Sequence, residues 1–272
     1  MKSSMLLAME EGNNELYDDL AWLYDATFDW DIEDEVDWLI ERLGEGIETV
    51  LEPFCGSGRM FPSFSRRGVT MFGVDISEEM LVRAEARMVT AGLPSPRTFR
   101  SDVRDFDLGG TFDGAICPIN SFAYLLSEEH VQRHLACVAR HLRSGGKYLV
   151  QVDLHWLAGF TGTDEPEVGE WEVDHEQGRI GVKWSGKEYD TKQRVEIQTA
   201  RFEMLDGPDE GKVYERDQRI RLWDWASWSA LIAASPFRQV AAYDGRTDGW
   251  PELALGEGIE DKLLTWHELV KT

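Results

Sequence analysis

The stretch that decides the fold is VLEPFCGSGR at residues 50–59, together with GVD at residues 73–75. The first part reads as a hydrophobic strand that ends in Glu52, followed by a glycine turn and a helix. The second part reads as another strand, which ends in Asp75. Glycine lets the backbone of the turn approach a ligand closely, and the next helix begins with unpaired N–H groups. Together these features predict a nucleotide-like ligand, with Asp75 suited to a ribose diol.

Two better-known phosphate-binding patterns do not fit this stretch. The dinucleotide pattern G-x-G-x-x-G lacks its third glycine, and Pro62 lies one residue beyond that position. No Gly-Lys-Ser/Thr follows the turn, so a Walker loop is excluded. An ordinary strand, turn and helix with a glycine at the turn is the structural alternative.

Composition and charge narrow the class of protein. The chain has 272 residues, 42% of them hydrophobic, which is enough for one large α/β domain. Its net charge of −23 opposes binding to nucleic acid, which draws on Lys and Arg, and would attract a cationic small molecule. The same charge is explained equally well by solubility. No apolar run approaches the ~20 residues that span a bilayer. Three separated cysteines indicate a reducing, cytoplasmic location.

The apolar pattern alternates between strand and helix periods along most of the chain. Residues 12–43 read as helical, and further helices are expected at 60–67, from Ser77 to Gly92, at 128–142 and at 224–234. Strands are expected at 49–52, 70–74, 97–101, 112–117, 147–154, 239–243 and 263–270. This order predicts an α/β fold, a Rossmann-like and mostly parallel seven-stranded sheet with helices on both faces.

The alternation of predicted strands and helices ends near residue 155. Three runs rich in β-formers, at 180–184, 194–202 and 212–223, predict an antiparallel sheet inserted as a lid. We therefore expect three segments: a nucleotide-binding core with the N-terminal helices at 1–154, the β insertion at 155–222, and the completion of the core sheet at 223–272.

The glycine turn and its acids resemble motif I of class I S-adenosylmethionine-dependent methyltransferases. The run Asn120-Ser121-Phe122-Ala123-Tyr124-Leu125 is similar to a segment of the small-molecule enzymes of this class, and Tyr17-Asp18 with Tyr24-Asp25 resembles their N-terminal helix. The resemblance covers about residues 15–155. It implies S-adenosylmethionine as the cofactor, with no metal.

The resemblance also implies which residues hold the cofactor. Glu52 would order the turn and the ligand's amino group, Asp75 would bind the ribose, and Asp102 would accept from the adenine amino group. Ile76 and Met80 would pack on the adenine, the backbone N–H of Val103 would reach a ring nitrogen, and the carbonyl of Cys117 would contact the methionine part. The remaining positions of the predicted cofactor site are Tyr17, Tyr24, Phe54, Gly56 and Gly58. Each has a structural alternative, such as a helix cap or plain core.

The substrate side is predicted from fewer residues. His155 follows the fifth strand at the active edge and could accept a proton near neutral pH. Asn120 could orient an amine or a hydroxyl, and the resemblance implies that Tyr24 closes over the cofactor. Each of these three candidate catalytic residues could equally be structural.

One departure leaves a second branch of methyltransferases open. The family usually has glycine where Phe54 stands. The residues around Phe54 resemble instead the Asp-Pro-Phe-x-Gly-Ser-Gly motif of DNA amino-methyltransferases. Those enzymes also need a proline-proline-aromatic motif, which Cys117-Pro118-Ile119-Asn120 lacks. We therefore expect methyl transfer to a small molecule, with an amine nitrogen as the preferred acceptor atom. Three alternative functions stay open: a small-molecule O-methyltransferase, a methyltransferase that acts on a macromolecule, and a cofactor-binding protein without turnover. The chain could also form a homodimer.

Overall fold

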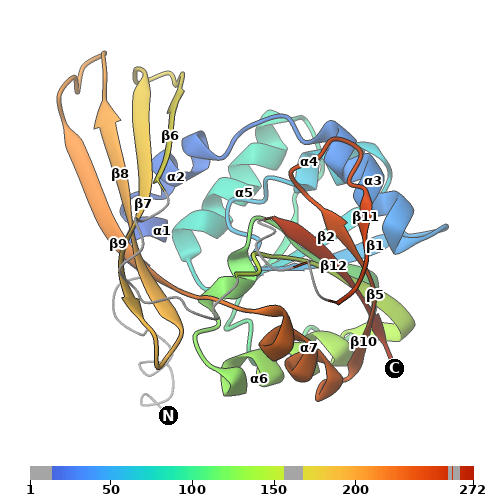
Figure 1. Ribbon diagram of the computed structural model, residues 1–272. Helices are drawn as coiled ribbons and strands as arrows, with labels where there is room; N and C mark the ends of the chain where they lie inside the picture. Colours follow the sequence, from blue (N-terminus) through green and yellow to red (C-terminus); the bar gives the residue numbers. More distant parts are fainter. Residues whose placement is uncertain (1–13, 156–167, 257–258, 260–263) are drawn as a thin grey trace, which may run out of the picture. The chain divides into compact units, whose positions relative to one another are not determined.

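The larger sheet of the computed structural model contains the expected strands in Rossmann-like order. The structure describes residues 14–155, 168–256, 259 and 264–272. The sheet has eight strands in the order β11-β10-β12-β5-β4-β1-β2-β3 (Figure 1). Their bounds are Thr49–Pro53 (β1), Thr70–Asp75 (β2), Arg97–Arg100 (β3), Phe112–Cys117 (β4), Leu142–Val152 (β5), Phe237–Asp244 (β10), Glu252–Leu253 (β11) and Thr265–Lys271 (β12). The α/β prediction is confirmed, and the two-residue β11 is the strand added to the expected seven.

The first five strands pair in parallel, which brings their carboxyl ends to one edge of the sheet. The pairs β3–β2, β2–β1, β1–β4 and β4–β5 are parallel, whereas β5–β12, β12–β10 and β10–β11 are antiparallel. The chain order reverses between β1 and β4. Ligands of open α/β sheets bind in the crevice at such a reversal.

Helices cover both faces of this sheet. Their bounds are Glu33–Leu43 (α3), Phe61–Arg66 (α4), Glu78–Thr90 (α5), Glu128–Arg140 (α6) and Trp225–Ala233 (α7), with a short 3₁₀ helix η1 at Ser121–Tyr124. Val50 packs in one core cluster with α3, α4 and α5, and its neighbour Leu51 packs in the other with α6 and α7. Successive side chains of a strand point to opposite faces, so the continuous apolar run of β1 fits a sheet buried on both sides.

The other sheet is antiparallel, with the strand order β6-β7-β8-β9. Its strands are Val168–Val173 (β6), Ile180–Asp190 (β7), Val195–Met204 (β8) and Val213–Arg221 (β9). The helices α1 (Asn14–Tyr17) and α2 (Ala21–Thr27) share one core cluster with it. In that cluster Leu16, Leu20 and Leu23 meet Val182 and Phe202.

The chain divides into two compact units, and the division differs from the expected segments. One unit comprises residues 1–30 and 160–221, and the other comprises residues 31–159 and 222–272. The N-terminal helices were expected with the nucleotide-binding core. They go with the inserted sheet instead because the leucines of α1 and α2 are buried against it. Trp223 and Trp228 are part of the larger unit's core, and Trp225 packs against it.

Within the described residues, no helix is both long and apolar enough to cross a membrane. The three cysteines Cys55, Cys117 and Cys137 are buried free thiols.

Gly73 of β2 is required by the packing beneath the glycine turn. A Cβ built there would lie 2.6 Å from Cys55 Sγ and 2.6 Å from Phe61 Cζ. Gly73→Ala is therefore expected to lower the free energy of unfolding by about 1–3 kcal/mol, the usual range for overpacking. The control is Gly110→Ala, because a Cβ at Gly110 would meet nothing within 4 Å. Urea unfolding followed by circular dichroism compares the two, and equal stabilities would contradict the prediction.

Candidate active site

The turn after β1 uses the left-handed backbone region three times. The φ angles are +61° at Phe54, +50° at Gly56 and +67° at Gly58. Two of these positions suit glycine, but Phe54 carries a side chain in a region that such residues seldom adopt. Its ring packs on the core, with its centroid 5.6 Å from that of His134. The family usually has glycine at this position; here Phe54 adopts the glycine-like conformation with its ring packed on the core.

Gly58 also leaves room for the helix that follows. A Cβ there would lie 2.9 Å from Phe61 Cδ2 and 3.0 Å from the Cβ of Ala84. A Cβ at Gly56 would meet nothing within 4 Å, so the backbone at Gly56 borders open space. The two glycines therefore have different roles. Gly58 allows α4 and α5 to pack closely, and Gly56 leaves its backbone accessible to a ligand.

Asp75 connects the end of β2 to the glycine turn. Its Oδ2 accepts a hydrogen bond from the backbone N–H of Gly56 (2.9 Å), and its Oδ1 accepts from that of Ser77 (2.9 Å). An ionised carboxylate has about four acceptor positions, so it can hold the turn and still accept from a diol. Asp75 is partly exposed. The structure thus brings Asp75 and Gly56 together, as the nucleotide hypothesis requires.

Glu52 is a buried carboxyl at the end of β1. Only 3% of the residue is exposed, and among the described residues no donor reaches its Oε2. Burial raises the pKa of Glu52 to about 8, opposed by the charge of Arg59 and assisted by those of Asp75 and Glu35. A buried acceptor without a donor is unfavourable in the folded protein. This oxygen therefore fits a ligand that supplies an N–H.

The protonation of Glu52 has a measurable consequence for stability. Because the pKa is higher in the folded chain than the ordinary 4.5, Glu52 stabilises the fold most at low pH, and that contribution is lost as pH rises through about 8. Glu52→Gln mimics the neutral carboxyl. Relative to wild type, this variant should gain about 2–3 kcal/mol in free energy of unfolding between pH 6 and pH 9.

Urea unfolding of the ligand-free proteins at several pH values measures this gain. Taking the difference between the two proteins cancels the titration of the histidines, which both share. A difference that stays constant from pH 6 to pH 9 would show that Glu52 is already ionised in the folded protein.

Asp102 lies after β3, and a guanidinium engages it. Arg104 Nε donates to Asp102 Oδ1 (2.9 Å) and Arg104 Nη2 donates to Oδ2 (2.7 Å). Burial raises the pKa of Asp102, but the hydrogen bonds from Arg104 outweigh it, so the pKa is lowered overall. The carboxylate stays ionised and keeps acceptor positions beyond those that Arg104 uses. Its predicted contact with an adenine amino group stays a prediction.

The residues predicted to surround the adenine differ in exposure. Ile76 is 39% exposed, an apolar side chain available for a ligand to cover. Met80 is fully buried and Val103 is 8% exposed. The carbonyl of Val103 is bound by His134 Nδ1 at 2.9 Å, which fixes its backbone. Ile76 therefore offers a surface for an apolar ring, whereas Met80 supports it from the core.

Cys117, Asn120 and His155 lie at the ends of β4 and β5. Cys117 is fully buried, and burial raises the pKa of its thiol to about 12, so only its backbone suits the predicted contact. Asn120 has φ +58°; its Nδ2 donates to Asp153 Oδ2 (3.1 Å), and its Oδ1 accepts from the backbone N–H of Asp153 (3.2 Å). The backbone N–H of His155 donates to the carbonyl of Trp223 (2.7 Å).

Tyr17 and Tyr24 belong to the other unit. Their rings lie edge to face with centroids 4.8 Å apart. The ring centroids of Tyr24 and Trp184 are 6.4 Å apart. Tyr17 donates its hydroxyl hydrogen to Gln218 Oε1 of β9 at 3.4 Å. The predicted role of both tyrosines in cofactor binding stays a prediction.

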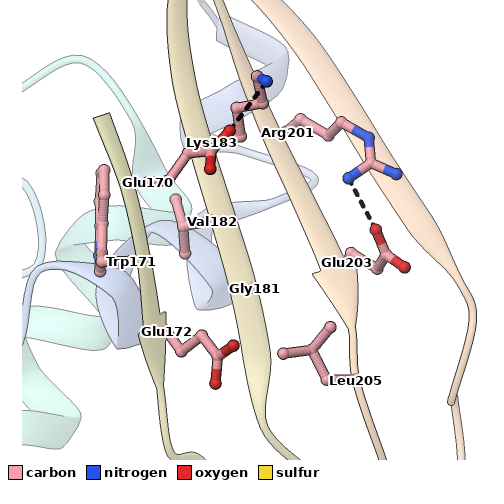
Figure 2. A pocket seen from close by; sticks show the side chains of 9 residues that line it. All are labelled: Glu170, Trp171, Glu172, Gly181, Val182, Lys183, Arg201, Glu203 and Leu205. Carbon is pink, nitrogen blue, oxygen red and sulfur yellow. Dashed lines mark hydrogen bonds and ion pairs between the residues drawn. The ribbon is translucent and has the colours of Figure 1, made fainter. Parts of the chain in front are cut away.

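A surface groove lies on the inserted sheet, with a volume of about 410 Å³. It lies over β6, β7 and β8, and Figure 2 shows the charged side chains around it. Those side chains satisfy one another: Lys183 binds Glu170 at 2.9 Å, and Arg201 binds Glu203 at 2.8 Å. Arg201 is thus engaged by a residue of its own strand.

Several polar residues at the edge of the larger sheet escaped the sequence analysis. Asp153 directly follows β5, so the rule that found Glu52 and Asp75 would also have found it. Glu35 and Arg59 form a partly buried ion pair with 3.8 Å between Oε2 and Nη2. No local pattern predicts that pair, because it joins α3 to the glycine turn.

Comparison of the sequence with protein-family models gives a match over the part of the chain that contains the glycine turn. Residues 50–146 match the family model described as "Methyltransferase domain". These residues contain the glycine turn, both strand-end acids and Asp102. This part of the chain is therefore similar to methyltransferase domains, as the resemblance implied, and the sheet around it has the Rossmann-like strand order.

Two curated relatives are N,N-dimethyltransferases of nucleotide-linked amino sugars. The chain is 31% identical over 103 residues to the dTDP-3-amino-3,4,6-trideoxy-alpha-D-glucopyranose N,N-dimethyltransferase of Streptomyces venezuelae, covering 38% of this chain and 41% of the relative. It is 30% identical over 139 residues to the dTDP-4-amino-2,3,4,6-tetradeoxy-D-glucose N,N-dimethyltransferase of Saccharopolyspora spinosa, covering 49% and 54%. The chain thus spans about half the length of these relatives.

Solved structures share the fold over nearly the whole chain. An S-adenosylmethionine-dependent methyltransferase from Clostridium acetobutylicum has a TM-score of 0.71 at 19% identity, covering 93% of this chain and 97% of that one. DesVI of Streptomyces venezuelae has a TM-score of 0.70 at 20% identity, covering 97% and 100%. At these identities the likeness concerns the fold.

Proposed function

We propose that the protein transfers a methyl group from S-adenosylmethionine to an amine nitrogen of a small molecule, in the cytoplasm. The observation that carries the proposal is the pair of acids at the ends of β1 and β2, with the turn of Gly56 between them. Amino sugars are the first acceptors to test, because two of the relatives are named as N,N-dimethyltransferases of amino sugars.

The residues present fit this cofactor. The unsatisfied Oε2 of Glu52 matches an ammonium donor, and Asp75 matches the ribose hydroxyls. Ile76 offers an exposed apolar surface for the adenine. When bound, S-adenosylmethionine supplies a methyl group on a sulfonium, which is already an activated donor.

The protein's own contribution is mainly alignment. Holding two reactants in the reactive geometry can be worth ~7–11 kcal/mol of the barrier. An amine attacks only in its unprotonated form, so a base near the acceptor assists. His155 at the end of β5, together with Asp153 and its partner Asn120, supplies polar groups at this edge.

A labelling experiment tests the proposal. The protein is incubated with methyl-labelled S-adenosylmethionine and a panel of nucleotide-linked amino sugars, simple amines, phenols and DNA. Label in an amino sugar, located on nitrogen by mass spectrometry, is the expected result. Label on a phenol oxygen or on DNA would replace the acceptor, and no transfer to any compound would contradict the proposed activity.

A further inference from the structure

Three ionisable side chains from separate elements lie near one another beneath the glycine turn, and each is largely shielded from solvent. Glu35 comes from α3, Glu52 from the end of β1, and Arg59 from the turn itself. The side chains of Glu35 and Arg59 are 15% and 10% exposed, and Glu52 is 3% exposed. Two carboxyl groups therefore share the neighbourhood of one guanidinium in a place with little water.

The guanidinium lies with one of the two carboxyl groups. Arg59 Nη2 is 3.8 Å from Glu35 Oε2, whereas Glu52 Oε2 accepts no hydrogen bond from any described residue. Arg59 is still close enough for its charge to lower the pKa of Glu52 against the effect of burial. The arrangement leaves Glu52 without the cation that the protein itself could provide.

The geometry points to Glu35 as a positioning residue of the donor site, which holds Arg59 away from Glu52 and so keeps the Glu52 carboxyl group for a cationic group of the ligand. This inference rests on the proposed function. Without the Glu35 charge, Arg59 would turn to Glu52, because a charge-assisted arginine–carboxylate pair is among the stronger hydrogen-bonded contacts in proteins. The protein would then fill the ligand's position with its own guanidinium.

The chemistry of the ligand identifies the group at Glu52. S-adenosylmethionine carries two cationic groups, the sulfonium and the α-ammonium, and only the ammonium has N–H bonds to donate. S-adenosylhomocysteine keeps that ammonium. 5′-Methylthioadenosine lacks the amino-acid part altogether, so its binding does not involve Glu52.

Calorimetry with these two compounds tests the inference in four proteins: wild type, Glu35→Gln, Arg59→Gln and the double variant. Glu35→Gln should weaken binding of S-adenosylhomocysteine at least fivefold and leave that of 5′-methylthioadenosine within twofold. Removing Arg59 as well should restore S-adenosylhomocysteine binding to within twofold of wild type. Glu35→Asp keeps the charge and should behave as wild type.

Each other outcome overturns the inference. Equal losses for both ligands in Glu35→Gln, or no restoration in the double variant, would mean a purely structural role. If Glu35→Gln does not fold, Arg59→Gln alone decides: unchanged or tighter S-adenosylhomocysteine binding supports the inference, and a fivefold loss means that Arg59 holds the ligand. A wild-type protein that binds neither compound overturns the proposed function and the inference with it.

Discussion

Replacing Asp75 with alanine is expected to weaken binding of S-adenosylhomocysteine about 100-fold. Two hydrogen bonds from ribose hydroxyls to a charged acceptor are together worth ~3 kcal/mol or more, and 1.4 kcal/mol is a factor of ten. The variant also releases the backbone N–H of Gly56 from Asp75, so the turn is less well ordered before the ligand arrives. Isothermal calorimetry at constant ionic strength measures the loss.

The matched control is Asp105→Ala. It removes the same charge, but the Asp105 side chain is 71% exposed and lies beside Arg133 and Arg140. Its affinity should stay within twofold of wild type. If the two variants bind alike, Asp75 contributes only through the net charge of the protein, and the ribose contact is wrong.

Trp228→Ala should lower the free energy of unfolding by about 3–5 kcal/mol, the range for deleting a buried aromatic side chain. Trp228 of α7 is fully buried, and its ring contacts those of Phe122 (5.5 Å) and His267 (4.7 Å). Its Nε1–H donates to Gln239 Oε1 at 2.9 Å. The substitution would leave a cavity and remove the donor of that amide oxygen.

Urea unfolding followed by circular dichroism measures this loss. Trp225→Ala on the same helix is the control, because Trp225 is only partly buried. Its effect should be about 1 kcal/mol. Equal effects at the two positions would mean that α7 contributes through its helix rather than through the anchoring of Trp228.

The parallel core could be predicted because local chemistry determines it. β1, β2 and β4 are short apolar runs bounded by glycine or acids. Ser77 was expected to begin a helix, and its hydroxyl does cap α5 by accepting from the backbone N–H of Met80. The strand-end rule then placed Glu52 and Asp75 at one edge before any contact was known.

The parts that escaped prediction depend on distant partners. β6 was missed because glycine and two glutamates interrupt its apolar alternation at Val168–Val173. The start of β5 was missed because Ser144-Gly145-Gly146 reads as a helix end, yet these residues continue the strand. The contact of Arg59 with Glu35 depends on how the glycine turn and α3 meet. A sequence pattern carries no record of that.

The unit that joins α1 and α2 to the antiparallel sheet has a consequence for synthesis of the chain. Leu16 and Leu23 leave the ribosome before the strands that bury them, which begin only at Val168. At the usual 5–20 residues per second that interval is on the order of 10 s. During it the apolar faces of both helices are open to chaperones, while β1 to β5 can already pair. The nascent protein should therefore form its nucleotide-binding core before α1 and α2 pack against the antiparallel sheet.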